Sequence, residues 1–282
     1  MTVRAISQDQ IKRIETDILR EFAAICESHG LRYCLAYGTC LGAVRHGGFI
    51  PWDDDIDVYM PRDDYERFFT LIQSGDVSSR YKLRSYRDGS SYHPHFKFVD
   101  SSTISYESYI DKKYSIGLWI DIFPLEIVED ASDPSVRRAF VMNKRLRSIL
   151  EILVGDKSSG TTLFAAIAKR MLYVFFARKD PMEVSRIIDE NASSLSTSFL
   201  RGENPERRGS LVDVIESRGD DVYAFDYDDI FPTVNGDFEG MKLPIPRQFE
   251  GYLTRCYGDW SALPPEKERR LHHSAAFYLD ES

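Results

Sequence analysis

Residues 37–59, YGTCLGAVRHGGFIPWDDDIDVY, are the stretch on which the predicted fold and chemistry of this chain depend. The first half is a turn of small residues that follows an apolar run, and the second half is an acidic cluster set between apolar residues. Successive side chains of a β-strand point to opposite faces, so a strand here would put Asp55 and Asp57 on one face and Ile56 on the other. Two carboxylates on one face repel each other and resist burial unless a positive charge neutralises them. A divalent cation does so directly, and oxygen ligands suit Mg²⁺ or Mn²⁺.

The alternative for this cluster is a solvated surface loop, which is what most acidic runs are. Here, however, the cluster is flanked by side chains that favour burial, namely Trp52, Ile56, Val58 and Met60. An acidic pair that enters a buried strand beside a glycine turn is seldom inert. We therefore favour a functional site over a surface loop.

Length and composition indicate a globular chain with one large domain or two small ones. The 282 residues can bury a sizeable core, and 43% hydrophobic residues with 13% aromatics are ordinary for a folded protein. A net charge of −9 argues against nucleic-acid binding. The four cysteines lack zinc-type spacing and are expected to be free thiols. There is no signal-peptide core and no apolar run of roughly 18 residues, so we expect a cytoplasmic protein, or one peripheral at the inner face of the membrane.

The pattern around the central stretch predicts its neighbouring elements. A capping box at Ser7 and Gln10, together with Gly30, predicts an amphipathic helix between these positions. The predicted elements that follow are a strand over 31–37, a short helix over 41–46, an acidic strand over 55–60 and a buried strand over 116–125. The amides that open the short helix could receive a phosphate.

Two charged residues in predicted strands are candidates for the same site. Lys97 lies between two phenylalanines, and it is either a solvent-facing residue or a phosphate ligand, two readings that we weight equally. Asp121 is the only charge in IGLWIDIFPL, residues 116–125, where a lone carboxylate is costly unless it is paired or metal-bound. We favour a third metal-facing carboxylate over a cap of the turn before Pro124.

Residues 137–179 differ from the rest of the chain in charge, with ten Lys or Arg residues and two acids. Two helices separated by GDKSSGT fit this pattern, and the second, over 163–177, is apolar almost all round. One interpretation is a helical hairpin packed on the core with ordinary basic faces. The other is a peripheral contact with an anionic membrane or with a lipid-linked acceptor, since a basic and apolar helix suits both.

A small-residue turn, basic side chains and three carboxylates together suit phosphoryl or nucleotidyl transfer. That reaction needs in-line placement and neutralisation of charge on phosphate oxygens more than covalent help from the protein. Glycine lets backbone amides approach the phosphates, and Arg45 and Lys97 would add positive charge at a diphosphate. The candidate substrate-binding residues are Gly38, Thr39, Arg45, His46, Trp52 and Lys97.

GTCLGAVRHGGFIPWDDDIDV, residues 38–58, closely resembles the signature of the LicD family, which also appears in fukutin-related protein. The turn, the RH pair, IPWDDDID and their spacing all match together. WIDIFPL and the later FEGMKLPIP and YLTRCYGDW also look like that family, so the resemblance covers most of the chain. Residues 137–179 are not a part that aligns with it.

The resemblance implies a nucleotidyltransferase-type fold and transfer of a phosphorylated alcohol, typically phosphocholine in bacterial members, from a CDP-activated donor to a glycan. By this resemblance Asp55 and Asp57 match the metal-binding pair and Asp121 the third acidic position. Gly38 and Thr39 match the glycine-containing turn. Cys40 stands where an aliphatic residue is expected, which has little bearing on the chemistry.

We therefore expect an α+β fold with a nucleotidyltransferase-type mixed β-sheet, flanking helices and a basic helical insertion. The expected units are a catalytic core over 1–133, a basic helical insertion over 134–195 that faces the acceptor or the membrane, and a segment over 196–282 that completes the core.

The expected activity is Mg²⁺- or Mn²⁺-dependent transfer of an alcohol phosphate, phosphocholine foremost, from CDP-choline or another CDP-alcohol. The acceptor is a hydroxyl of a cell-surface glycan, such as a lipopolysaccharide, teichoic acid or capsule, or of its lipid-linked precursor. Asp55, Asp57 and Asp121 are the expected catalytic and metal-binding residues. A choline group would need an aromatic cage, with Tyr37, Trp52, Tyr92, Tyr106 and Trp119 as candidates, whereas glycerol or ribitol would need hydrogen-bonding groups.

Two rivals remain at this point. A nucleotidyltransferase acting on a small sugar or alcohol phosphate would use the same aspartates but leave a nucleoside monophosphate on the product. A glycan-binding or membrane-binding module without catalysis would use the acidic cluster only to bind a cation.

Overall fold

The structure of the chain is a computed structural model, which describes residues 3–75, 80–107, 110–155, 178–200, 209–216, 221–269 and 275–280. At its centre lies a mixed β-sheet with the strand order β2-β3-β7-β5-β4, extended by β8 and β9 beyond the end of β7. The strands are β1 Val3–Ala5, β2 Cys34–Leu35, β3 Asp57–Pro61, β4 Tyr81–Arg84, β5 Phe96–Asp100, β6 Thr103–Glu107, β7 Leu118–Val128, β8 Ser210–Asp213, β9 Tyr223–Asp226, β10 Val234–Phe238, β11 Met241–Ile245 and β12 Ala275–Asp280.

Strand β7 organises this sheet. It is 11 residues long and buried throughout, as its nearly uninterrupted apolar run requires. Its first part pairs parallel with β3 and antiparallel with β5, and its last three residues pair with β8. In this register Asp57 of β3, Asp121 of β7 and Lys97 of β5 form one row across three strands. The sheet therefore gathers three of the predicted site residues.

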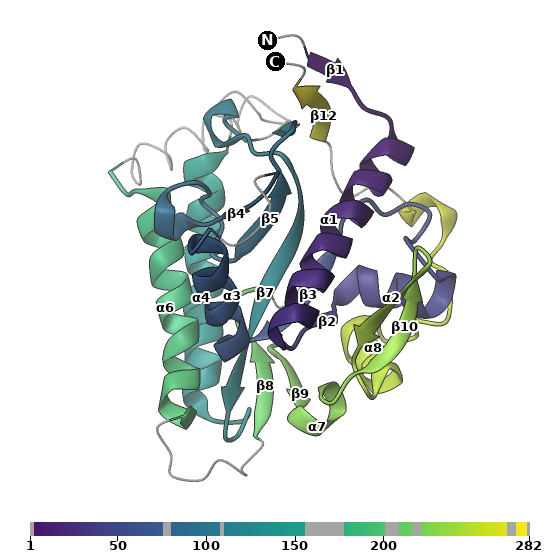
Figure 1. Cartoon of the computed structure of the whole chain (residues 1–282). Coiled ribbons are helices and arrows are strands. Elements are labelled where there is room, and N and C mark those ends of the chain that lie inside the picture. Colours follow the sequence, from purple (N-terminus) through teal and green to yellow (C-terminus); the bar gives the residue numbers. More distant parts are fainter. Residues whose placement is uncertain are drawn as a thin grey trace.

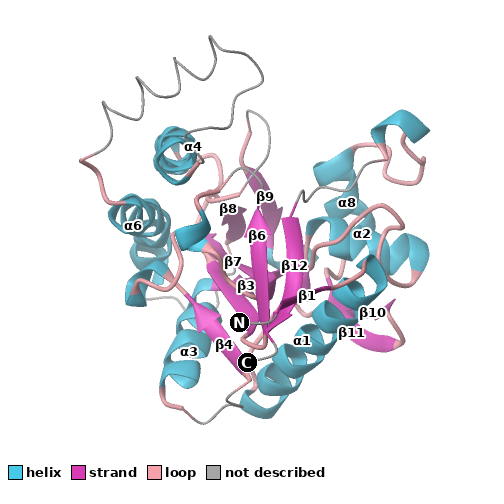
Figure 2. Ribbon diagram, turned by 90° about the horizontal axis from the view of Figure 1, so that it is seen from above, coloured by secondary structure: helices cyan, strands magenta, loops and turns pink. Residues whose placement is uncertain are grey.

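The helices cover the sheet in two groups (Figure 1, Figure 2). Their bounds are α1 Gln8–His29, α2 Tyr37–His46, α3 Arg62–Gln73, α4 Pro134–Val154, α6 Pro181–Leu200, α7 Tyr227–Ile230 and α8 Phe249–Tyr257. The paired helices α4 and α6 lie on one side of the molecule, and α1, α2 and α8 lie on the other. The larger core packs α1 against the sheet, and a second core lies between α4, α6 and β8.

A buried ionic cluster joins the α4–α6 side to the sheet. The Arg62 guanidinium at the start of α3 donates hydrogen bonds to Glu126 of β7, and its Nη1 lies 2.9 Å from Asp189 Oδ1 of α6. The latter is an ion pair by distance, although its angle is not that of a hydrogen bond. Asp189 Oδ2 accepts from Tyr86 Oη at 2.6 Å and from Arg87 Nη2 at 2.8 Å. Because Arg62, Glu126 and Asp189 are all buried, their charges depend on one another.

Two smaller β-structures complete the fold. Strand β12 lies between β1 and β6 in an antiparallel sheet, so segments near the two ends of the chain are neighbours (Figure 1). Phe277 of β12 also packs against Trp119 of β7, with 5.8 Å between ring centroids. The hairpin β10–β11 places Glu239 at its tip, where Oε1 accepts from the Phe49 amide in the loop before the acidic cluster.

The α+β class is confirmed, and so are several local predictions. The Ser7–Gln10 capping box and the left-handed Gly30 bound α1 as predicted, and the four cysteines are free thiols. The predicted strand over 31–37 is wrong outside Cys34–Leu35, because Tyr37 already begins α2. The helix that was expected over 41–46 thus starts four residues earlier, and β3 begins at Asp57, leaving Asp55 in the preceding loop.

Other predictions stay predictions. The nucleotidyltransferase-type character of the sheet and the three-part division of the chain are not decided by the element order. The first helix predicted in the basic segment is α4, whereas the second, over 163–177, lies outside the described residues. Among the described residues, no helix combines the length and apolar character needed to cross a membrane.

Candidate active site

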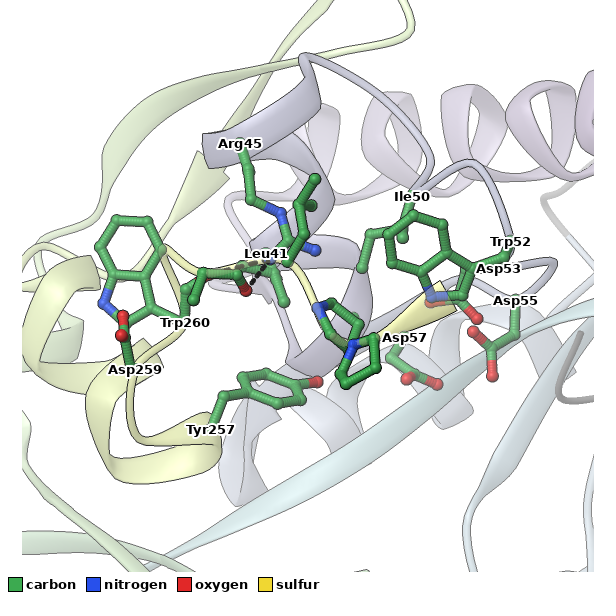
Figure 3. A pocket seen from close by; sticks show the side chains of 15 residues that line it. Leu41, Arg45, Ile50, Trp52, Asp53, Asp55, Asp57, Tyr257, Asp259 and Trp260 are labelled. Atoms are coloured by element: carbon green, nitrogen blue, oxygen red, sulfur yellow. Dashed lines mark hydrogen bonds between the residues drawn. The ribbon is translucent and has the colours of Figure 1, made fainter. Parts of the chain in front are cut away.

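A pocket of about 490 Å³ lies between α2, residues 53–56 before β3, here called the acidic loop, and the segment that follows α8. Figure 3 shows Asp55 and Asp57 on one side of it and Trp260 and Asp259 on the other, with the ring of Tyr257 between them. The lining residues are Gly38, Leu41, Arg45, Ile50, Trp52, Asp53, Asp55, Asp57, Tyr257, Asp259, Trp260, Ala262, Leu263, Pro264 and Pro265. The pocket thus brings together Gly38, Arg45, Trp52, Asp55 and Asp57 of the predicted site.

The acidic loop crowds several carboxylates together. Asp53 and Asp54 are buried, and one oxygen of each, Oδ1, has no hydrogen-bond partner among the described residues. Burial, the charge of Asp55 and a hydrogen bond between the two side chains raise the pKa of Asp53 to about 8. Carboxylates crowded in this way are stabilised by a shared proton or by a cation.

The start of α2 fixes Asp57 and leaves room for the acidic loop. Thr39 is buried, and its hydroxyl oxygen accepts a hydrogen bond of 2.8 Å from the Asp57 amide. Thr39 therefore positions a predicted metal ligand through its side chain. A Cβ placed on Gly38 would lie 2.6 Å from Asp53 Oδ2, so a larger residue here would require the Asp53 carboxylate or the start of α2 to shift.

Asp121 lies beside Asp57 in register, but its carboxylate already has three partners. Its Oδ1 accepts from Lys97 Nζ at 2.6 Å and pairs with His95 Nε2 at 2.9 Å, and its Oδ2 accepts from Trp119 Nε1 at 2.9 Å. Burial alone would raise the pKa of Asp121, but the charge of Lys97 and the bond to His95 outweigh it and hold the pKa far below its usual value. Asp121 is thus a firmly ionised carboxylate.

Lys97 is neither solvent-facing nor directed into the pocket lining. The residue is buried, and its Nζ lies 4.1 Å from the centre of the Trp119 ring as well as against Asp121. The structure therefore shows Lys97 as the counter-ion of Asp121. His95 was not identified from the sequence, although a histidine two residues before a lysine in a strand shares its face.

The Arg45 and His46 side chains interact with each other at the end of α2. Arg45 Nε donates to His46 Nε2 at 3.0 Å, and Arg45 Nη1 donates to the carbonyl oxygens of Trp260 at 2.9 Å and Ala262 at 3.4 Å. Burial, aided by the charge of Arg45, lowers the pKa of His46. Trp52 lines the pocket with the guanidinium of Arg269 stacked 5.1 Å from its ring centre.

Glu15 is a carboxylate near this site that the sequence reasoning missed. It is 3% exposed, and its Oε2 has no hydrogen-bond partner among the described residues. Burial, followed by the charges of Asp55 and Asp54, raises the pKa of Glu15 well above its usual value. A signal was available, because Glu15 follows Ile11 by four residues and so falls on the apolar stripe of α1.

The segment 257–265 is the other part of the site that was missed. It carries Tyr257, Asp259 and Trp260 into the lining, and only the last letters of YLTRCYGDW pointed to it. Of the five residues considered for an aromatic cage, Trp52 alone is among the described lining residues. The Tyr37 hydroxyl instead donates to Asp213, and Trp119 packs against Lys97 and donates its indole N–H to Asp121.

The residues present fit a divalent cation in their chemistry. The acidic loop offers carboxylate oxygens as possible metal ligands, and Mg²⁺ and Mn²⁺ prefer such ligands. Two of these oxygens are buried and have no hydrogen-bond partner among the described residues. Within the described residues, no three His, Cys, Asp or Glu side chains are already gathered as in a formed metal site. Loading of a cation would therefore require the carboxylates to turn toward a common point.

Comparison with known proteins agrees with the motif. The family described as LicD/FKTN/FKRP, nucleotidyltransferase domain, matches residues 30–145, which contain the acidic loop, Lys97 and Asp121. The lipopolysaccharide cholinephosphotransferase LicD of Haemophilus influenzae is 26% identical over 270 residues, which is 93% of this chain and 94% of that protein. Residues 30–145 are thus similar to the LicD family, and nearly the whole chain is similar to one protein of that name.

More distant LicD-family relatives share only part of the chain. The ribitol 5-phosphate transferases FKRP of mouse and human are each 49% identical over 39 residues, which is 14% of this chain and 8% of those proteins. The chain therefore spans nearly the whole of the Haemophilus relative but a small part of the mammalian ones. Those relatives are transferases of two different alcohol phosphates by name.

Proposed function

We propose that this chain is a metal-dependent phosphotransferase that moves an alcohol phosphate from a CDP-activated donor to a hydroxyl of a cell-surface glycan or its lipid-linked precursor. Phosphocholine is the favoured group, because the relative that matches nearly the full length is a lipopolysaccharide cholinephosphotransferase by name. The observation that carries the proposal is the pocket in which Asp55, Asp57, Gly38 and Arg45 meet.

In this proposal the acceptor hydroxyl oxygen attacks the phosphorus that bears the alcohol. The bond between that phosphorus and the bridging oxygen of the diphosphate breaks, and CMP leaves with the bridging oxygen. The hydroxyl proton passes to a carboxylate. Asp55 suits this role better than Asp121, because both oxygens of Asp121 accept from Lys97, His95 or Trp119.

The other residues of the site would position the donor and balance its charge. A Mg²⁺ or Mn²⁺ ion held by Asp55 and Asp57, with Asp53 beside them, would neutralise charge on the diphosphate. Asp121, next to Asp57 in register, adds negative charge for the ion to balance, and its pairing with Lys97 limits that charge. Arg45 lies on the same pocket wall as Gly38 and would contact a phosphate oxygen. His46 and Trp52 would frame the donor.

The decisive experiment is mass spectrometry of the products after the purified chain is offered CDP-choline, CDP-glycerol and CDP-ribitol with Mg²⁺ and a glycan acceptor. We expect CMP release and addition of phosphocholine to the acceptor. Asp55→Asn and Asp57→Asn should each lower turnover by about 100-fold or more while the far-ultraviolet circular dichroism is unchanged. The matched control is Asp237→Asn, which changes an exposed carboxylate of β10 that pairs with Lys242 of β11.

Two results would overturn the proposal in different ways. A product that carries a nucleoside monophosphate would identify a nucleotidyltransferase. No turnover with any CDP-alcohol, despite binding of Mg²⁺, would favour a binding module. Removal of the metal with a chelator should abolish turnover, and Mg²⁺ or Mn²⁺ should restore it.

A further inference from the structure

The side of the pocket opposite the aspartates is formed by residues 257–265, here called the C-terminal wall. Arg45 Nη1 holds this wall through the Trp260 carbonyl at 2.9 Å, and Arg269 Nε holds it through the Pro264 carbonyl at 2.9 Å. Two of its side chains are large, apolar and solvent-exposed, namely Tyr257 at 39% and Leu263 at 51%. Exposed apolar side chains that line a pocket are candidate contacts for a ligand.

The composition of the C-terminal wall restricts which ligand that is. Its described lining residues are Tyr257, Asp259, Trp260, Ala262, Leu263, Pro264 and Pro265, and this set contains no Ser, Thr, Asn or Gln side chain. The hydrogen-bonding side-chain groups of the set are the Tyr257 hydroxyl, the Asp259 carboxylate and the Trp260 indole N–H. A polyol such as glycerol or ribitol would leave its other hydroxyl groups against apolar carbon, which is unfavourable. A quaternary ammonium has no N–H to satisfy and binds to ring faces, to apolar carbon and to a nearby anion.

One carboxylate, that of Asp259, lies on this wall beside the guanidinium groups of Arg45 and Arg269, which donate to its backbone carbonyls. Asp259 is exposed, and its Oδ1 accepts from Ser261 Oγ at 2.8 Å, which fixes the side chain without neutralising it. The nearby guanidinium of Arg269 lies over Trp52, so that ring face is already covered by a cation. On the C-terminal wall, Asp259 is the carboxylate and Tyr257 is an exposed aromatic side chain of the pocket lining.

We propose that the C-terminal wall is the subsite for a quaternary ammonium group of the donor, recognised by the ring of Tyr257 and the carboxylate of Asp259. This inference rests on the proposed function. The arrangement in Figure 3 places the wall across the pocket from Asp55 and Asp57, so a donor can hold its phosphates at the aspartates and its trimethylammonium end at Tyr257. The subsite selects choline over glycerol and ribitol.

The test measures binding without an acceptor, so that it does not depend on turnover. The affinity of the purified full-length chain with Mg²⁺ is measured by calorimetry for three ligands. These are CDP-choline, the CDP ester of 3,3-dimethylbutanol, which has the same shape but no charge, and CMP. The variants are Tyr257→Leu and Asp259→Asn. The matched control is Asp130→Asn, an exposed aspartate outside the pocket whose Oδ1 accepts from the Ser132 amide at 2.8 Å.

We expect the wild-type chain to bind CDP-choline about fivefold or more tightly than the neutral ester, as a cation near an aromatic face and a carboxylate should. Each wall variant should reduce this ratio by about threefold or more and leave CMP affinity unchanged, whereas Asp130→Asn should change neither. Equal affinity of the wild-type chain for the two esters would overturn the subsite. So would an equal loss of affinity for both esters and CMP in the variants, which would assign the wall to the nucleoside.

The outcomes separate the subsite from the reaction. Charge-selective binding without turnover would keep the subsite and reject the proposed function. If the chain turns over but both variants keep the wild-type ratio of affinities for CDP-choline and the neutral ester, the proposed function stands and the subsite is rejected. Failure of the chain to bind any CDP ester would reject both.

Discussion

At the scale of single residues, Gly38 controls how closely α2 approaches the acidic loop. A methyl group there would lie 2.6 Å from Asp53 Oδ2, so Gly38→Ala must displace either the carboxylate or the helix start. We expect a loss of about 100-fold in kcat/KM, because a displacement of about 1 Å in a positioning group can cost that much. Gly251→Ala on α8, where an added Cβ meets nothing within 4 Å, is the control. Similar kinetics for both variants would show that the close approach is unimportant.

Lys97 supports the charge of Asp121. Lys97→Met removes the 2.6 Å bond to Asp121 Oδ1 and leaves a buried carboxylate without its cation. We expect the free energy of unfolding at pH 7 to fall by about 3–5 kcal/mol, as for other buried pairs that lose one partner. Urea unfolding measures this, with the exposed Lys82→Met on the neighbouring strand β4 as control. A loss no larger than that of the control would contradict the pairing.

At the scale of secondary-structure elements, the start of α2 is set by contacts with distant segments. Tyr37 has a left-handed backbone (φ 42°), its amide donates to Tyr252 Oη at 2.7 Å, and its hydroxyl donates to Asp213 of β8. Tyr59 Oη also donates to Asp213, at 3.0 Å. Strand β8 and helix α8 therefore hold the helix end that carries Gly38.

The role of Tyr252 can be tested by removing one oxygen. Tyr252→Phe leaves the buried Tyr37 amide without its acceptor, so we expect about 1–3 kcal/mol of destabilisation and lower turnover. Tyr65→Phe is the control, because the Tyr65 hydroxyl is buried and has no hydrogen-bond partner among the described residues. Thermal unfolding and turnover of the two variants decide the matter. Equal behaviour of the two would argue against control of α2 by Tyr252.

These contacts explain which elements could be predicted. Helix α1 was read from local signals alone, namely its capping box, its apolar spacing and Gly30. The start of α2 could not be predicted from local signals, because the positive φ of Tyr37 depends on partners more than 170 residues away in the chain. Likewise, the sequence indicated that Asp121 needs a partner, but strand register alone decides that Lys97 provides it.

At the scale of the whole molecule, the buried ionic cluster joins the α4–α6 side to the central sheet. Burial opposes ionisation of Asp189, but the charges of Arg62 and Arg87 outweigh it and lower the pKa of Asp189. A group with a lowered pKa in the folded state stabilises the fold above its unfolded pKa of about 3.9, and this contribution is lost as the pH falls through the folded value. The cluster should therefore weaken in acid.

This predicts a difference in pH dependence. The free energy of unfolding of the wild-type chain should fall more steeply between about pH 5 and pH 2 than that of Asp189→Asn, which cannot titrate there. At pH 7 the variant should be less stable by about 3 kcal/mol, because Arg62 loses a buried partner. Urea unfolding across this range, with the surface variant Asp237→Asn for comparison, measures both quantities. Parallel curves for wild type and Asp189→Asn would refute the role of the cluster.

The whole-molecule arrangement also sets the limit of sequence reasoning about the pocket. The acidic loop and α2 lie within 23 consecutive residues, 37–59, so their motif was visible at once. The C-terminal wall lies about 200 residues later in the chain and reaches the pocket only through the fold. Its place in the pocket could be recognised only from the fold, which puts Tyr257 and Asp259 in the same lining as Asp55 and Asp57.

The position of β12 has a practical consequence for handling the protein. Phe277 forms the outer support of the Trp119 indole, and that indole donates to the carboxylate beside Asp57. Proteolytic trimming of the last strand would remove this support and loosen the indole, although the cut lies outside the pocket lining. A preparation shortened by a few residues could therefore look inactive while the acidic motif itself is intact.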